Sequence, residues 1–217
     1  MVSGSGGGGD PERTLRLLWR DTAEPARGPQ PGLSVDRVVA AAVAVADAEV
    51  VAPVQGADWR ARLWRVAWNN WELYHRHPWL LGAVTGRPLL GPNETVKYDA
   101  ELRAFDGVGL TDVERDAVLS VVLGLARECA RAAVELARLA ERTGWDEARW
   151  WRVHGPLLER YVDAGRFPVA ARVGQAAGAA HQAALSPRYT FEFGLACLCD
   201  GVEALLRRRG DGQGGVT

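Results

Sequence analysis

The chain has 217 residues, of which 47% are hydrophobic and 24% are charged, enough for one large or two small globular domains. Its formal net charge of −1 excludes a strong positive field that would draw it to nucleic acid. Three cysteines do not suggest a disulfide framework, and no apolar stretch reaches the roughly 20 residues of a membrane span. The opening MVSGSGGGGDPERT lacks the apolar segment of a secretory signal. We expect a soluble, cytoplasmic protein with no membrane partner.

The first part of the chain, residues 1–31, reads as a flexible Gly/Ser-rich tail and a Pro/Gly linker around a possible short helix, DPERTLRLLWR. Ser34 is a good N-cap, and SVDRVVAAAVAVADAE then has helical apolar spacing. Pro53 and Gly56 end that pattern before Asp58. Residues 32–57 therefore form a second short region.

The longest region, residues 58–210, carries apolar residues at helical spacing and no alternating pattern of a strand, which predicts an all-α fold. Thr111 and Glu114 form a capping-box pattern before a long helix. Gly155-Pro156 is expected to interrupt the helix that follows it. The segment 167–185 is either a weaker helix or a mobile segment. The predicted helices cover residues 58–78, 94–109, 112–142, 143–162 and 188–209.

Several segments, in this order and spacing, resemble the TetR family of bacterial repressors, in its actinobacterial branch with a tetracycline-repressor-like C-terminal domain. They are DPERTLRLLWR, GLSVDRVVAAAVAVADAE, WELYHRHPWLL, RPLLGPN, KYDAELRAFDGVGLTDVERDAVLSVVLG and FEFGLACLCDGVEALL. The resemblance implies a ligand-responsive transcriptional repressor with a TetR-like helical bundle. It also implies a homodimer formed by a four-helix bundle, a pocket for a small-molecule effector, and operator DNA as the partner of intact relatives.

The DNA-reading part of this pattern does not fit into the sequence. A helix-turn-helix places its second helix in the major groove, and two short helices with a turn need roughly 20 residues. Only nine residues, Glu49 to Ala57, separate ADA from DWR, and one of them is Pro53. They include no Arg, Lys, Ser, Thr or Asn to contact phosphates or bases. We therefore identify no DNA-binding residue; a natural deletion and an incomplete gene sequence both remain open.

Two apolar seams are candidates for the dimer interface implied by the resemblance. One lies on the long helix and the other on the last helix, at alternating steps of three and four residues. The alternative is that both seams form the core of a single chain. The candidate residues are Val118, Val122, Leu125, Phe191, Leu195, Leu198 and Val202.

A helix rich in tryptophan, together with a second Trp/His group, is the candidate effector site. Large apolar walls with a few polar groups are typical of ligand pockets, and equally of a core whose polar atoms are satisfied. The candidate residues are Trp68, Asn70, Trp71, Tyr74, Trp150 and His154.

Enzymatic and metal-binding signatures are weak. Cys197-x-Cys199 and His75-x-His77 place their pairs about 200° apart on a helix, a poor chelating geometry. No phosphate-binding, nucleophile-elbow or zinc-protease motif is present. We expect no metal, no cofactor and no enzyme activity. The main hypothesis is a TetR-type regulator without its DNA-reading helices; the alternative is a ligand-binding or heterodimerising module that does not bind DNA itself.

Overall fold

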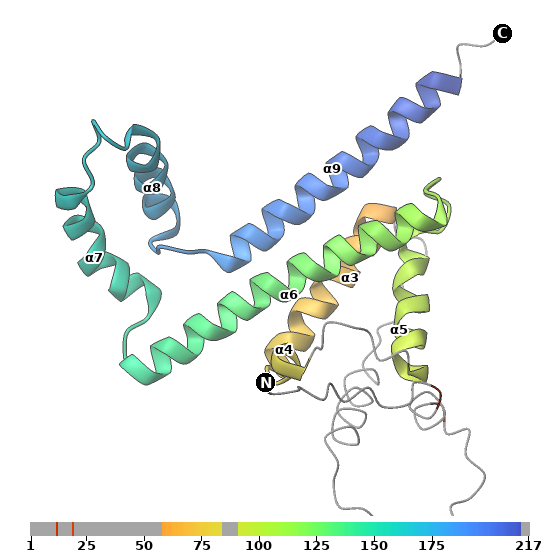
Figure 1. Cartoon of the computed structure of the whole chain (residues 1–217), viewed down its shortest axis with the longest axis horizontal. Helices are drawn as coiled ribbons and strands as arrows, with labels where there is room; N and C mark the ends of the chain where they lie inside the picture. The colour runs from red at the N-terminus through yellow and green to blue at the C-terminus, as the bar shows by residue number, and fades with distance from the viewer. Residues whose placement is uncertain (1–11, 13–18, 20–57, 84–90, 214–217) are drawn as a thin grey trace, which may run out of the picture. The chain divides into compact units, whose positions relative to one another are not determined.

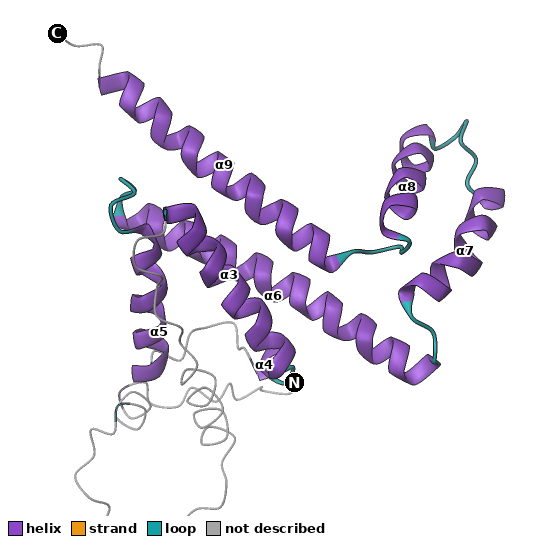
Figure 2. Ribbon diagram, turned by 180° about the vertical axis from the view of Figure 1, so that it is seen from behind, coloured by secondary structure: helices purple, strands orange, loops and turns teal. Residues whose placement is uncertain are grey.

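The computed structural model describes residues 58–83 and 91–213, with Glu12 and Trp19. Every regular element in these ranges is a helix, so the all-α prediction is confirmed (Figures 1 and 2). The helix expected after Ser34 and the spacer after it lie outside the described residues. Two compact units are present, Met1–Asn69 with Trp79–Gly109 and Asn70–Pro78 with Leu110–Thr217. Helix α3 (Trp59–Arg76) contributes to both.

The first unit contains the N-terminal part of α3, α4 (Leu80–Ala83), α5 (Pro92–Leu102) and the 3-10 helix η1 (Arg103–Phe105). Its described core includes Leu63 and Phe105, both fully buried. The Arg62 side chain donates hydrogen bonds to the backbone oxygens of Ala104 (3.1 Å) and Asp106 (2.7 Å). The guanidinium thus satisfies carbonyl groups at the end of η1 that no helix partner uses.

The second unit is built on α6 (Asp112–Thr143) and α9 (Pro187–Gln213), which pack against each other. The predicted capping box is confirmed, because the Thr111 hydroxyl accepts from the Glu114 amide and the Glu114 carboxylate accepts from the Thr111 amide. Gly144 ends α6 at φ 68°, a left-handed conformation that glycine adopts without strain.

The remaining helices of this unit are α7 (Glu147–Tyr161) and α8 (Pro168–His181), which pack on each other. We call residues 145–185 the arm. The expected interruption at Gly155-Pro156 is wrong, because α7 continues through Pro156. A residue before proline is kept out of the helical region by clashes of the proline ring with its N–H and its Cβ, and Gly155 lacks the second of these. The segment 167–185 contains a regular helix, α8, which settles the choice left open by its sequence.

Candidate effector site and dimer surface

The buried end of α3 carries an aromatic contact with α9. Trp71 is buried and its ring stacks on Phe191, with centroids 4.9 Å apart. His75, one turn later, lies 4.6 Å from the same indole, and its Nδ1 is 2.8 Å from the Trp71 carbonyl oxygen. Since a carbonyl oxygen only accepts, Nδ1 carries the proton. These contacts make Trp71 part of the core of the second unit.

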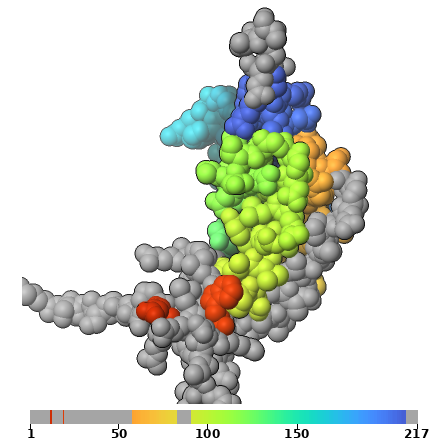
Figure 3. All heavy atoms as spheres, turned by 90° about the vertical axis from the view of Figure 1, so that its right-hand side faces the viewer, coloured from red at the N-terminus to blue at the C-terminus, as the bar shows by residue number. Residues whose placement is uncertain are grey.

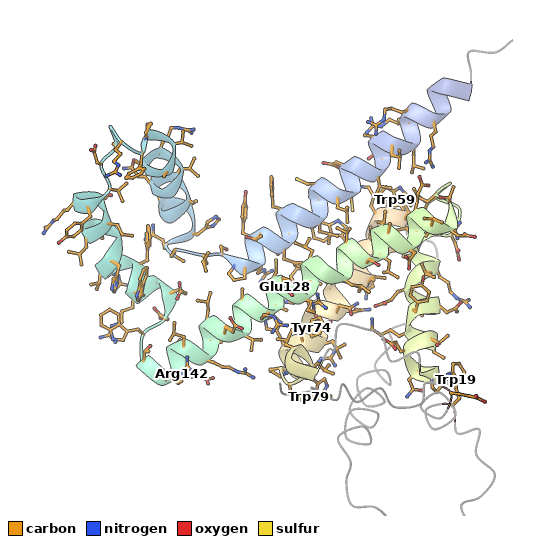
Figure 4. The ribbon with its side chains drawn as sticks, viewed as in Figure 1. Trp19, Trp59, Tyr74, Trp79, Glu128 and Arg142 are labelled. Carbon is orange, nitrogen blue, oxygen red and sulfur yellow. The ribbon has the colours of Figure 1, made fainter. Side chains whose placement is uncertain are left out.

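The other candidates on α3 differ in their burial. Asn70 is 3% exposed, and Tyr74, which Figure 4 labels, is half-buried in the same unit. A buried amide is costly unless it is hydrogen-bonded, so the orientation of Asn70 is constrained by its surroundings. Trp68 is half-buried and belongs to the first unit.

The second candidate group forms a compact ring cluster at the start of α7. The rings of Trp150 and His154 stack with centroids 4.1 Å apart and an interplanar angle of 7°. Trp145 meets His154 edge-on at 6.4 Å, and the Arg149 guanidinium lies 4.6 Å from the Trp145 ring centre. Trp145, Trp150 and His154 are half-buried. The sequence pointed to Trp150 and His154, and the structure adds Trp145 and Arg149 as their neighbours.

The hydrogen bond of His154 determines what this cluster offers to a ligand. Its Nδ1 lies 2.9 Å from the Trp150 carbonyl oxygen and must donate to it. When the ring is uncharged, this bond makes Nε2 its acceptor. Within residues 58–83 and 91–213, no hydrogen bond to this Nε2 is present. The cluster therefore combines flat apolar walls with one acceptor of fixed direction.

The structure separates the seven candidate dimer residues into two classes. Val122, Phe191, Leu195 and Val202 are each at most 5% exposed within a single chain. For these four, the structure agrees with the alternative that the seams form an intramolecular core, since a side chain already covered has no surface left for a partner. Val118, Leu125 and Leu198 remain half-buried. Leu125 also fills the space over Gly194, where an added Cβ would lie 3.0 Å from its methyl carbon.

A second apolar face, which the sequence reasoning missed, lies opposite this core on α9. Tyr189 and Phe193 are 51% and 58% exposed, and their rings stack with centroids 5.8 Å apart. The ring of His181 lies 4.6 Å from that of Tyr189. On α6, Val121 is 56% exposed. In the sequence, the four-residue spacing of Tyr189, Phe193 and Cys197 could have indicated this face. The longer Phe191–Val202 seam was predicted as the interface instead.

An ion pair joins the start of α6 to the end of α9, between distant parts of the sequence. Both guanidinium nitrogens of Arg209 reach the Glu114 carboxylate, one of them at 2.9 Å. The blue α9 and the green α6 adjoin in the space-filling view (Figure 3). Hydrogen bonds from Arg209 and from Thr111 lower the pKa of Glu114 to about 2. Glu114 thus caps α6 and ties it to the end of α9.

The cysteines are separated by their surroundings. Cys129 and Cys199 are buried, whereas Cys197 is exposed. Burial raises the pKa of the Cys129 thiol, and the nearby charge of Glu128 adds to this effect. Cys129 is therefore a protonated, apolar side chain. Within the described ranges, no three His, Cys, Asp or Glu side chains gather as metal ligands would. None of the helices described has the length and apolar character for crossing a bilayer.

Comparison with known proteins places this chain among transcriptional regulators. Residues 52–206 match the family described as tetracyclin repressor-like, C-terminal domain. The chain is also similar to the HTH-type transcriptional repressor DrrR1 of Streptomyces coeruleorubidus, with 32% identity over 251 aligned positions covering 94% of this chain and 90% of that protein. Proteins of this family regulate transcription and are not enzymes. The family match and the all-helical structure together show that the chain belongs to the TetR family of transcriptional regulators.

Proposed function

We propose that this protein is a ligand-responsive TetR-type regulator that keeps its effector-binding and dimerising domain, residues 58–210, but not the helices that read DNA. The observation that carries the proposal is the nine-residue spacer between the first-helix pattern and Asp58. That spacer is less than half the length that two short helices and a turn require, roughly 20 residues.

The alignment with the repressor DrrR1 supports a missing segment. It spans 251 positions, whereas this chain has 217 residues, so at least 34 positions of the alignment hold residues that this chain lacks. That number is more than a helix-turn-helix needs. Residues 32–57 are then a remnant of the DNA-binding domain, and residues 1–31 precede it.

The proposed effector site is the ring cluster at the start of α7, where Trp150 and His154 form a stacked pair. On α3 of the same unit, the half-buried Tyr74 is a further candidate, whereas Asn70 and Trp71 are covered within the single chain. The acceptor Nε2 of His154 would orient a ligand that carries a hydroxyl or amine donor.

The proposed homodimer uses the half-buried Val118, Leu125 and Leu198 together with the outward residues Val121 and Phe193. These side chains are at least partly open in one chain, and a helix pair with two apolar faces can use one for its core and one for a partner. Apolar side chains left in water on long helices are typical of such interfaces.

A mobility-shift titration with duplex DNA from upstream of its own gene tests whether the protein lacks the helices that read DNA. We expect only weak retention that disappears as salt rises, since the described surface and the spacer offer no base-reading helix. Salt-resistant, sequence-specific retention would falsify the proposal.

The dimer is tested by a matched pair of variants on α6, examined by sedimentation. Val121→Glu adds a charge on the outward apolar face and should weaken association at least about tenfold. Ser120→Glu adds the same charge at the adjacent exposed position and should leave association unchanged. Equal effects of the two variants would count against this interface.

The second candidate function is a module that never contacts DNA and acts by binding effector or by pairing with an intact relative. The same spacer favours it. Mixing the protein with a full-length relative and following subunit exchange by native mass spectrometry distinguishes the two. Mixed dimers that lose operator binding would support the alternative, and strict homodimers would exclude its heterodimerising form.

A further inference from the structure

The ring cluster at the start of α7 presents two flat surfaces that meet at a steep angle. Trp150 and His154 lie nearly parallel, so each ring covers one face of the other. Trp145 crosses the plane of the imidazole at 69°, with its centroid 6.4 Å away. All three side chains are half-buried, so part of each ring surface is open to solvent. Such a corner accommodates the face or the edge of another flat ring.

The hydrogen-bonding edge of the imidazole decides which polar group a ligand must carry. Nδ1 of His154 donates to the Trp150 carbonyl oxygen at 2.9 Å, and Nε2 of the uncharged ring can only accept. A ligand carbonyl or ether oxygen gains no hydrogen bond at this edge, because it is also an acceptor. The ligand group that faces Nε2 must therefore carry a hydrogen on oxygen or nitrogen.

One charged group lies directly on the rings of the cluster. The guanidinium of Arg149 is 4.6 Å from the centre of the Trp145 ring, and its Nη1 donates to the Gly144 carbonyl oxygen at 3.2 Å. The acidic Asp146 caps α7 by accepting from the Arg149 amide at 2.7 Å. Glu147 follows in the first turn, and no ion pair within residues 58–83 and 91–213 joins it to the cluster. A ligand cation would thus meet a guanidinium that already occupies the cation-attracting ring face.

We propose that the ring cluster selects a flat aromatic ligand with an uncharged hydroxyl group, a phenol, over an aromatic amine that carries a positive charge. The inference rests on the proposed effector site and names its ligand class. A phenol supplies a flat ring for the corner and an O–H donor for Nε2 of His154, and it brings no charge against Arg149. A cationic amine also has a donor, but the guanidinium repels it, and this repulsion weakens as salt rises.

Three probes with the same naphthalene ring system test the ligand class by equilibrium dialysis at neutral pH. They are 2-naphthol, which is an uncharged donor, 2-methoxynaphthalene, which has lost the donor, and 2-naphthylmethylamine, which is a cation. We expect 2-naphthol to bind about tenfold more tightly than the ether. We also expect it to bind about fivefold more tightly than the amine.

The outcomes separate the ligand class from the proposed function. Equal affinities for the three probes, or tightest binding of the amine, would overturn the ligand class and leave an effector site at the cluster. Absence of binding by all three would overturn the ligand class and remove the cluster as the effector site. The missing DNA-reading helices and the homodimer have their own tests, by mobility shift and sedimentation, and would stand or fall separately.

A matched pair of histidine variants locates the hydroxyl contact. His154→Phe keeps a flat ring beside Trp150 but removes the acceptor, so it should bind 2-naphthol and the ether equally. His181→Phe removes an imidazole that lies against Tyr189 on another helix, and should keep the wild-type preference. In NMR spectra of the wild-type protein, the Nε2 resonance of His154 should shift when 2-naphthol is added. An unchanged preference in His154→Phe would contradict the proposal.

A second pair of variants tests the charge. Arg149→Gln removes the guanidinium from the Trp145 ring and should abolish the discrimination against 2-naphthylmethylamine. Arg152→Gln removes the same charge from an exposed position on the same helix, and should leave that discrimination close to the wild-type value. Equal effects of the two variants would show that the overall charge of the helix, and not the guanidinium on the ring, opposes the cation, and would overturn this part of the proposal.

Discussion

The α6–α9 pair and the arm are made of similar helices but are held together differently. The pair encloses fully buried large side chains, Phe191, Leu195 and Leu119 among them. The arm has only two buried residues in its helices, Gly155 and Gly178, joined by the half-buried Trp151. Because buried apolar area scales with side-chain size, the pair should dominate the free energy of unfolding and the arm should open first.

The largest effect is expected from shortening a core side chain of the pair. Leu195→Ala removes atoms from a position with no solvent exposure and should lower the free energy of unfolding by about 2–5 kcal/mol. Urea denaturation followed by circular dichroism measures it. Leu198→Ala, at a half-buried position on the same helix, is the control and should cost less. Equal losses would mean that the pair is not organised around Leu195.

A smaller and local effect is expected in the arm. Gly178→Ala forces a methyl group against the Trp151 ring and should destabilise the α7–α8 contact by about 1–3 kcal/mol. Gly174→Ala is a matched control, because no atom lies within 4 Å of its Cβ and alanine favours a helix by about 0.5–1 kcal/mol. Exchange of the α8 amides should speed up in the first variant and slow down in the second. Loss of the α6–α9 pair in Gly178→Ala would show that the two regions are not independent.

The smallest effect concerns the ion pair at the end of the α6–α9 pair. The pKa of Glu114 is lowered in the folded chain to about 2, so folding favours its charged form. The resulting stabilisation is complete above the ordinary glutamate pKa and is lost as pH falls toward about 2. Glu114→Gln should therefore be less stable than wild type at neutral pH.

The difference between Glu114→Gln and wild type should shrink with acid and vanish below about pH 2. Urea midpoints measured between neutral pH and that limit follow it. A difference that does not vary with pH would assign the effect to a changed side-chain geometry at position 114 and not to the charge of the ion pair.

Local sequence signals predicted the helices well. The Thr111–Glu114 box and the helical apolar spacing act within a few residues, and both are present in the structure. The Gly155-Pro156 pattern predicted an interruption that α7 does not have, and Gly155 lacks the Cβ that contributes to the clash with a following proline ring. The seam Phe191–Leu195–Val202 has the spacing of an interface, but the same spacing serves a core, and only tertiary packing distinguishes the two.

The aromatic clusters likewise show that contacts within one helix can be predicted from the sequence, whereas contacts between helices cannot. The Trp150–His154 stack follows from a four-residue spacing on one helix and could be anticipated. The stack of Trp71 on Phe191 and the packing of Trp151 against Gly178 join residues far apart in the sequence. No periodicity within one helix contains that information.

The contact between Trp151 and Gly178 also limits which amino-acid substitutions this protein can accept. Every amino acid other than glycine brings a Cβ to position 178, where the indole ring already occupies the space. Four residues earlier, Gly174 faces open space and accepts side chains freely. In a saturation library, codon 178 should therefore be nearly invariant among variants with an ordered arm, while codon 174 should record many substitutions.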